Sequence, residues 1–478
     1  MDETSSPGRD QELRKYALLV ACTASFFIPF MGSAINLAIP SIGEQFNSSA
    51  LLLSWVAASY LLASAAFLVP FGRLADIVGR KRVFVAGIGI FSLSSLLCGL
   101  AWSIDSLISF RILQGIGSAM LFGTGMAILT SVYPPQERGR VLGINVASVY
   151  TGLSLGPVLG GAMNHNLGWQ SIFYFTAVTT LAVLLLAVFK LKGEWAGARG
   201  EKFDLTGACL YSVGLVSLMY GFSSIATSVW AKYLLVLGLA VLAVFVRYEL
   251  KVRQPVLNLA LFSKNVTFAF ANLAALINYS ATFAVGFLLS IYLQVVQGYN
   301  SQAAGLILLS QPVIMALLSP FAGSLSDRVE PRIVASLGMA LTTVGLFVFC
   351  FLTASTPIWL LIVNLMLLGT GFALFSSPNS NSIMGSVEKR FYGVASSTMG
   401  TMRLTGQALS MAIVTLLLAL YVGSVQLNQA SADLLVQGTR TAFVVFTVIC
   451  FGGIFASLAR GNARAGEPAE QDQRDLRQ

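Results

Sequence analysis

The sequence predicts an all-helical protein that crosses a membrane many times. Of its 478 residues, 56% are apolar and only 10% are charged, and the mean hydropathy is +0.78. Soluble domains carry about 25% charged residues, so this chain has too few to cover a water-exposed surface. Its apolar stretches run for about 20 residues, which is the length of a membrane-spanning helix and about twice that of a barrel strand. These observations exclude a soluble fold and a β-barrel.

Fourteen apolar stretches are expected to form the spans, and they leave no loop long enough for a separate domain. In chain order they cover residues 16–39, 51–71, 83–102, 107–132, 141–163, 171–189, 205–225, 230–246, 266–293, 303–321, 333–352, 357–375, 393–421 and 441–458. The first of them is too long for the apolar region of a signal peptide, so we expect it to be retained as a helix.

The basic residues predict the orientation of these spans. If the N-terminus is cytoplasmic, 25 of the 29 lysines and arginines fall in cytoplasmic segments, and only Lys232 and Arg440 fall outside. This bias follows the positive-inside rule and predicts a multi-pass protein of the inner or plasma membrane with both termini in the cytoplasm. The net charge of +9 then reflects topology and contact with the anionic lipid bilayer, so no nucleic-acid partner is expected.

The chain contains an internal duplication. The segment from Pro70 to Asp76 is repeated from Pro320 to Asp327, at an offset of 250 to 251 residues. Each copy has six spans, so we expect a polar tail (1–15), an N-terminal six-helix bundle (16–190), a two-helix insert with flanking cytoplasmic loops (191–265), a C-terminal six-helix bundle (266–459) and a second polar tail (460–478). Paired bundles are typical of secondary transporters, whose substrate site lies between the halves near the membrane midplane.

The loop after the second span combines glycines with an acid and several cations. Its main residues are Gly72, Arg73, Asp76, Gly79 and Arg80, and the second half repeats part of the pattern as Gly323 and Asp327. Glycine permits a tight turn, and an acid among cations can form an ion pair that breaks when the two bundles rock apart. Pro331 replaces the second glycine of the repeat, so the second loop is expected to hold the two bundles together less strongly than the first.

This loop resembles the major facilitator superfamily, whose signature here is Gly-x-Leu-x-Asp-x-x-Gly-Arg-Lys. Further matches follow in span four, from Arg111 to Gly117, and in span five, where a glycine and proline run resembles the antiporter signature. That run contains Gly152, Gly156, Pro157, Gly160 and Gly161. Its residue types equally suit a small-residue packing seam that bends at Pro157, without any export direction.

Finer matches along essentially the whole chain resemble the fourteen-span drug:proton antiporter branch of the superfamily. They include Trp55-Val56, Phe203-Asp204-Leu205-Thr206-Gly207 and Pro378-Asn379. The resemblance implies a secondary transporter that exports small lipophilic or amphipathic compounds by proton antiport, with alternating access between two bundles. A narrower exporter or facilitator of an organic anion, lipid or metabolite is the alternative, and a non-transporting receptor or scaffold is an alternative of another class.

Span one departs from this branch, which typically has an intramembrane aspartate where this chain has Met31. By the expected spans, all 20 acidic residues lie at or beyond the membrane edges. Three hypotheses remain open. Asp105, about two turns outward of Arg111, carries the proton; or the substrates are neutral, zwitterionic or anionic and are held by Arg111 and Arg403; or the protein is an uncoupled facilitator.

Two arginines lie inside expected spans, where a charged side chain is costly and is a functional residue by default. The resemblance links Arg111 to proton coupling, and a structural hydrogen-bonding role is the alternative. The other cavity candidates are polar or aromatic residues that could instead bond neighbouring helices together. They are Ser33, Asn36, Tyr60, Gln114, Asn145, Tyr150, Asn278, Tyr279, Gln311 and Asn364, together with Arg403.

The sequence predicts no enzyme, metal site or cofactor. Its single histidine, His165, is expected in an outer loop without carboxylate or cysteine neighbours, so it makes no metal site. No phosphate-binding loop of an ATP-driven pump is present, and no nucleophile, base or ligands are clustered. The expected partners are a small-molecule substrate, protons and the bilayer, with no obligate protein partner.

Overall fold

The computed structural model describes residues 7–257, 259, 262, 265–387, 392–423 and 432–460. Within these residues it is all-helical and has 14 segments long and apolar enough to span a membrane, so the predicted fold class is confirmed. The first half contributes α1 (Pro7–Phe46), α2 (Ala50–Val78), α3 (Arg80–Gly99), α4 (Ile104–Val132), α5 (Pro135–Leu167) and α6 (Gln170–Phe189). The next two helices are α7 (Leu205–Ser223) and α8 (Ala231–Glu249).

The second half begins with α10 (Val266–Thr282), α11 (Val285–Ile291), the π-helix η1 (Tyr292–Val296), α12 (Ser301–Leu308) and α13 (Ser310–Arg328). It ends with α14 (Pro331–Phe349), α15 (Ile358–Gly385), α16 (Tyr392–Tyr421) and α17 (Ala432–Leu458). Several helices exceed the expected spans. Because α5 continues to Leu167, His165 lies exposed in its last turn and not in the outer loop that was expected.

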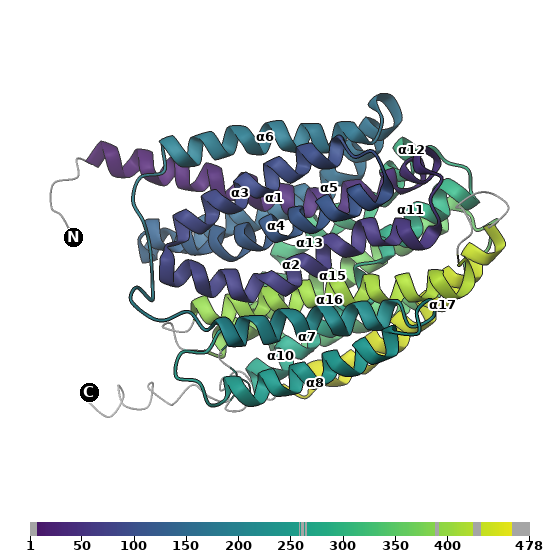
Figure 1. Cartoon of the computed structure of the whole chain (residues 1–478). Coiled ribbons are helices and arrows are strands. Elements are labelled where there is room, and N and C mark those ends of the chain that lie inside the picture. The colour runs from purple at the N-terminus through teal and green to yellow at the C-terminus, as the bar shows by residue number, and fades with distance from the viewer. Residues whose placement is uncertain are drawn as a thin grey trace.

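The helices run in roughly one direction and form two packed groups (Figure 1). In the first half α1 packs on α5, and α4 packs on α2 and α3; in the second half α15 packs on α13 and α14, and α10 packs on α16 and α17. The α7–α8 hairpin contacts both groups through α7, which lies against α2 and α16. Tyr211 and Ser212 of α7 donate hydrogen bonds to the carbonyls of Ala65 and Ala66 in α2.

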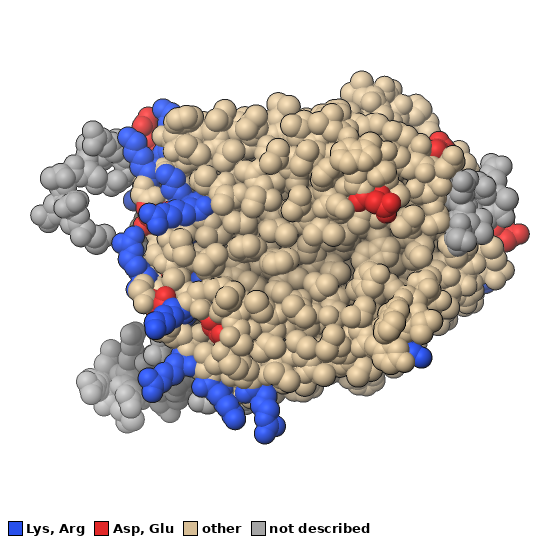
Figure 2. Space-filling view, in the orientation of Figure 1, with Lys and Arg blue, Asp and Glu red and all other residues tan. Residues whose placement is uncertain are grey.

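Lysines and arginines gather at the end of the molecule where both termini lie (Figure 1, Figure 2). We call this the basic end and the opposite one the far end. All five ion pairs among the described residues belong to segments at the basic end. This segregation is the pattern from which the sequence predicts a cytoplasmic basic end.

Spans nine and ten are present as expected, and each has a local break in its helix. In span nine the amide of Ala284 bonds to the hydroxyl of Ser410 in α16 rather than to its own helix, and the segment ends in the π-helix η1. In span ten the break follows Leu308, where Pro312 has no amide hydrogen to donate to the carbonyl four residues earlier. Discontinuous helices of this kind commonly line the substrate site in transporters.

One face of α5 becomes steadily more buried from the basic end to the far end. Three- and four-residue steps, which follow one helix face, connect Gly143, Ala147, Tyr150, Ser154, Pro157 and Gly161. The first two are exposed, the middle two half-buried and the last two buried. At the far end this face meets α12, where Gly161 lies against the Ser301 carbonyl and Gly305 against the Pro157 carbonyl.

The partner face on α12 and α13 shows the same gradient. Ser301 and Gly305 are buried, Pro312 is half-buried, and Ala316 and Pro320 are exposed. Close contact at the far end and matching exposure toward the basic end mean that α5 and α12 are joined at the far end and that α5 and α13 diverge toward the basic end, while α16 stays in contact with α2 and α4. The structure is therefore open between these helices toward the basic end.

Replacing Gly161 should disrupt this far-end contact. A Cβ atom at Gly161 would overlap the Ser301 carbonyl oxygen, whereas a Cβ at Gly143 on the same face would have open space around it. We expect Gly161→Val to separate the far ends of α5 and α12 and Gly143→Val to leave them together. Spin-label distances between cysteines at positions 165 and 302, in a cysteine-free background, measure this. An unchanged distance in Gly161→Val would contradict the packing described.

Candidate transport pathway

Arg111 is buried inside the N-terminal bundle and is held by neutral groups. Its Nε donates to the Val56 carbonyl at 2.9 Å and its Nη1 to Gln114 Oε1 at 2.5 Å. Its guanidinium carbon lies 4.3 Å from the centre of the Tyr60 ring. Nη2 is buried and has no hydrogen-bond partner. The carbonyl and amide dipoles and the face of the Tyr60 ring therefore stabilise this cation, and its Nη2 nitrogen remains without a partner.

The groups around Arg111 extend its network across three helices. Gln114 donates to Ser95 Oγ of α3 at 2.7 Å, and Tyr60 of α2 bonds Ser118 Oγ of α4 at 2.9 Å. Three sequence candidates, Arg111, Tyr60 and Gln114, thus lie together. This network also serves as the interhelical hydrogen bonding that the sequence left as an alternative.

No carboxylate compensates Arg111 among the described residues. None of their ion pairs includes it, and Asp105 lies exposed in the first turn of α4. Met31 is fully buried, and its sulfur accepts a hydrogen bond from Thr176 of α6. Every described acid that falls within a spanning segment lies within three residues of one end of that segment. The apolar layer of the described chain therefore contains the buried cation Arg111 and no acid.

A second cation lies where the two bundles meet. Arg403 of α16 has its guanidinium carbon 5.4 Å from the centre of the Tyr279 ring of α10, and its buried Nε has no partner. The Tyr279 ring also packs edge-on against Phe372 of α15. Across the interface, the Tyr150 hydroxyl of α5 lies 3.5 Å from Ser376 Oγ of α15. We call Arg403, Tyr279, Phe372, Tyr150 and Ser376 the interbundle cluster.

The interbundle cluster has the composition of a site for amphipathic compounds. Aromatic rings supply apolar surface, while hydroxyls and the Arg403 guanidinium, with its unpartnered Nε, supply fixed polar groups. Tyr150, Tyr279 and Arg403 were expected from the sequence, whereas Ser376 and Phe372 were not. The pair Ser376-Ser377 just before Pro378 was a weak signal for the former, and nothing local distinguishes Phe372 from other apolar residues of its span.

Several other candidates bond neighbouring helices within one bundle. Asn145 accepts a hydrogen bond from Ser25 of α1, and Asn364 donates to the Gly345 carbonyl of α14. Ser33 bonds carbonyls of its own helix. Asn36 is different, because its carbonyl accepts a hydrogen bond of 2.6 Å from Ser290 of α11 and so joins the two bundles at the far end.

Two amide side chains lie near the interface without a described hydrogen bond. Asn278, next to Tyr279 in α10, is fully buried, and neither its amide nitrogen nor its oxygen has a partner. Gln311 of α13 is half-buried, and its backbone carbonyl contacts Gly369 of α15. A buried amide normally pairs with protein, water or ligand, so Asn278 is a polar contact still available to a bound molecule.

The glycine and proline run of α5 packs on two helices. Gly152, Gly156 and Gly160 lie against the backbone or Ser33 of α1, with no room for a Cβ, and Gly161 contacts α12 as described. Pro157 lies within α5 and contacts Gly305 of α12 through its carbonyl. The small residues therefore let α5 approach one helix of each bundle closely.

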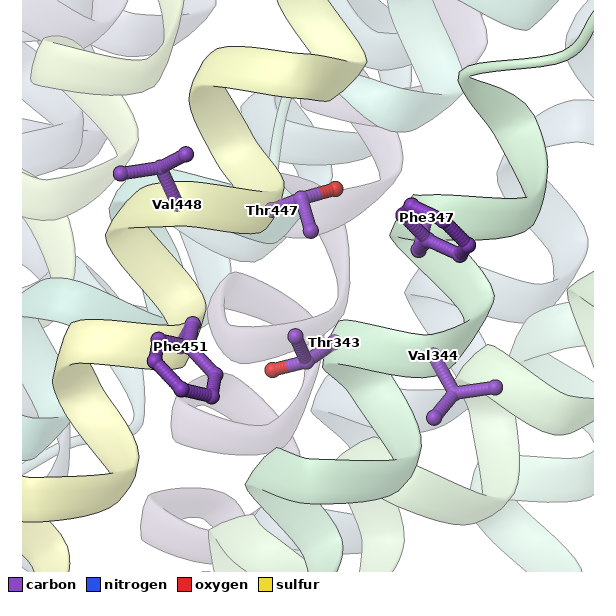
Figure 3. Close-up of a pocket in the computed structure, with 6 residues that line it drawn as sticks. All are labelled: Thr343, Val344, Phe347, Thr447, Val448 and Phe451. Carbon is purple, nitrogen blue, oxygen red and sulfur yellow. The ribbon is translucent and has the colours of Figure 1, made fainter.

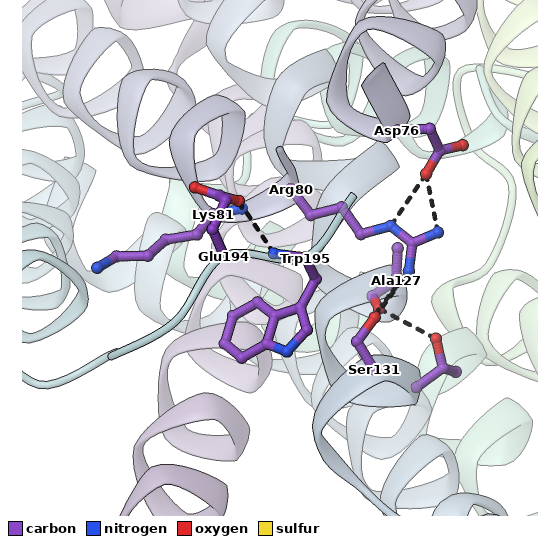
Figure 4. Close-up of polar contacts among 8 residues, drawn as sticks. Asp76, Arg80, Lys81, Ala127, Ser131, Glu194 and Trp195 are labelled. Atoms are coloured by element: carbon purple, nitrogen blue, oxygen red, sulfur yellow. Dashed lines mark hydrogen bonds and ion pairs between the residues drawn. The ribbon is translucent and has the colours of Figure 1, made fainter. Parts of the chain in front are cut away.

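The loop between α2 and α3 is held by the linker that precedes α7 (Figure 4). Arg80 bonds Asp76 Oδ1 through Nε at 2.9 Å and Nη2 at 2.8 Å, and its Nη1 reaches Ser131 of α4. From the linker, the Trp195 carbonyl accepts a hydrogen bond from the Arg80 amide, and Glu194 Oε1 accepts one from the Lys81 amide.

Two further contacts complete this junction. Arg73 forms an ion pair with Glu201 of the linker. Gly79 has a φ of +127°, a conformation that favours glycine, and a Cβ there would overlap Glu194. Gly72 has open space around its Cα. The sequence analysis did not predict that Glu194 and Glu201 of the linker pair with this loop, because the motif contains an acid of its own, Asp76, among its cations.

The repeat of this loop is described in part. Gly323 lies in α13, close to Ser377 of α15, and Asp327 belongs to the last turn of the same helix, with its side chain outside the described residues. Residues 388–391, which repeat the loop before span five, also lie outside them.

A separate apolar groove lies between α14 and α17 on the C-terminal bundle (Figure 3). It is lined by Thr343, Val344, Phe347, Thr447, Val448 and Phe451. It includes no ionisable residue and no member of the interbundle cluster, and Val448 is 66% exposed. These features suit contact with lipid chains rather than recognition of a polar substrate.

Comparison with known proteins identifies the family. The model described as Major Facilitator Superfamily matches residues 21–273 and 271–477. The riboflavin transporter RibZ of Clostridioides difficile (strain 630) is 30% identical over 441 residues, covering 92% of this chain and 96% of that protein. The cephamycin export protein CmcT of Amycolatopsis lactamdurans is 32% identical over 409 residues, covering 83% of each.

Two more comparisons agree with the architecture. The multidrug resistance protein Stp of Mycobacterium tuberculosis (strain CDC 1551 / Oshkosh) is 31% identical over 416 residues, covering 85% of this chain and 76% of that protein. The crystal structure of a bacterial homolog of the human lysosomal transporter Spinster, inward-facing and unoccupied, has a TM-score of 0.69 at 17% identity, covering 95% of this chain and 98% of that one. The family match, the relatives and the fold agree: this chain belongs to the major facilitator superfamily and is a membrane transporter.

Proposed function

We propose that this transporter exports small lipophilic or amphipathic compounds by alternating access driven by proton antiport, and that the interbundle cluster binds them. The observation that carries the proposal is Arg403, whose buried Nε has no partner, among aromatic and hydroxyl groups contributed by both bundles. A cation without a nearby acid repels cationic compounds and attracts anionic or zwitterionic ones. The preferred substrates are therefore neutral, zwitterionic or anionic.

The names of the relatives support export of such compounds. Stp is named for multidrug resistance, CmcT for cephamycin export, and a Streptomyces glaucescens protein for tetracenomycin C resistance and export. RibZ is named a riboflavin transporter, which favours a second candidate, a narrower transporter of one metabolite. Discrimination among dyes separates the two functions, because a broad exporter accepts several scaffolds and a narrow one does not.

Transport in proteoliposomes with an imposed pH gradient tests the proposal. We expect the gradient to drive neutral and anionic dyes of similar size and to drive a cationic dye at least about tenfold more slowly, because the half-buried Arg403 and the buried Arg111 have no compensating acid among the described residues. Transport that is indifferent to the gradient would refute antiport and support the facilitator alternative. Preference for the cation would refute the proposed charge selectivity.

Arg403→Ala tests the binding site. Removing the guanidinium removes both the charge and the Tyr279 stacking partner, so we expect transport of an anionic dye to fall about tenfold or more. Transport of a neutral dye should fall less. Arg403→Lys keeps the charge without the planar group and should recover part of the anion transport. Equal losses for both dyes in the alanine variant would show that Arg403 serves folding rather than recognition.

Arg111→Ala and Asp105→Asn test the coupling candidates separately. We expect Arg111→Ala to abolish gradient-driven transport, because it removes the cation around which Gln114 and Tyr60 are arranged. Gln114→Ala serves as the control for loss of the hydrogen-bond network alone. If Asp105→Asn leaves gradient-driven transport intact, Asp105 is not the proton carrier, and a pathway through other groups is required.

A further inference from the structure

Two carboxyl groups converge at the basic end of the α7–α8 hairpin. Asp204 caps the start of α7, and Glu249 is the last residue of α8. A Cβ added at Gly207 would lie 2.7 Å from Glu249 Oε1 and would overlap Asp204 Oδ2, so both carboxyls border the same small space. The hairpin therefore brings two acids together that are 45 positions apart in the chain.

One oxygen of each carboxyl is already used. Asp204 Oδ1 accepts hydrogen bonds from the Gly207 amide at 2.9 Å and the Tyr248 hydroxyl at 3.1 Å, and Glu249 Oε1 accepts the Val256 amide at 3.2 Å. The remaining oxygens, Asp204 Oδ2 and Glu249 Oε2, are buried and have no partner. Glu249 is only 3% exposed, so its unpartnered oxygen has little access to bulk water as a hydrogen-bond donor.

The charges around the pair do not balance it. From α2, Arg73 is the neighbouring cation, and it already forms an ion pair with Glu201 of the linker. Tyr248 of α8 is the other titratable neighbour, and it donates to Asp204. The Glu201 and Glu249 carboxyls thus share the Arg73 guanidinium, and Asp204 adds a further negative charge beside Glu249. Glu249 is buried and Asp204 is half-buried, so a negative charge on Glu249 is penalised both by burial and by the adjacent carboxylate, and a proton shared by the pair removes this penalty.

We propose that Asp204 and Glu249 form a proton-binding site that holds one proton between them and so makes transport respond to pH at the basic end. With the proton, a hydrogen bond between the two carboxyls ties the start of α7 to the end of α8. Without it, the two carboxylates repel each other across this junction. Since α7 contacts both α2 and α16, separating the ends of α7 and α8 changes how α7 packs against the two bundles.

This inference deepens the proposed function by naming a site of its regulation, but its first test does not require transport. Infrared difference spectra of the full chain in nanodiscs, recorded over roughly pH 5 to 9, detect the carboxyl that gains or loses the proton. We expect one such band in the native protein and its loss in both Glu249→Gln and Asp204→Asn. Glu12→Gln, which changes an exposed acid in α1, should keep the band. A band that persists in both pair variants would overturn the proton site.

A second measurement tests the consequence for transport. The glutamine amide oxygen in Glu249→Gln can still accept the Val256 amide, so the variant is expected to fold, which melting in the same nanodiscs checks. We expect the rate of dye transport in Glu249→Gln to vary less than about twofold over that pH range, and the native rate to vary about tenfold. An unchanged pH profile in a variant that has lost the infrared band would overturn the regulatory role. If neither protein transports any dye, the proposed export function fails while the infrared result still decides the proton site.

Discussion

Backbone contact between α5 and α12 at the far end is the constraint on which the rest of the arrangement depends. Gly161 and Gly305 carry no side chain, so each helix approaches a carbonyl of the other directly. Asn36 and Ser290 add a hydrogen bond between the bundles at the same end. With the far ends joined, α5 and α13 diverge toward the basic end, and the interbundle cluster lies between the joined and the divergent parts of the interface.

The pathway is organised around cations that are stabilised without acids. Arg111 relies on a carbonyl, an amide and the face of Tyr60, and Arg403 relies on the face of Tyr279. A charged side chain in the apolar layer costs about 3 kcal/mol or more unless protein groups or water solvate it. Nη2 of Arg111 and Nε of Arg403 remain unpaired, so each cation retains capacity to bind a ligand. The proposed proton coupling then requires groups outside this layer, and the Asp204–Glu249 pair lies at its basic edge.

The sequence predicted the fold well because spans are set by apolar length, a local property. It also predicted that Arg111, Tyr60 and Gln114 matter, because polar residues within apolar spans are rare enough to identify individually. It did not predict that span nine breaks near Ala284, because that break depends on a hydroxyl from α16. Nor did it predict the linker contacts, because Glu194 and Glu201 resemble ordinary loop acids until the fold places them against Gly79 and Arg73.

The most direct test measures the distance between the basic-end halves of α5 and α13 in an otherwise cysteine-free protein that keeps the native residues of the far-end contact. Spin labels at Ala147 of α5 and Ala316 of α13, which are exposed on the two helix faces described above, report this distance with and without a transported anionic dye. We expect a single long distance without substrate. With substrate, we expect a second population at a shorter distance, because the bundles rock about the interbundle cluster. A single short distance under both conditions would contradict the divergence of the two bundles and the access route that depends on it.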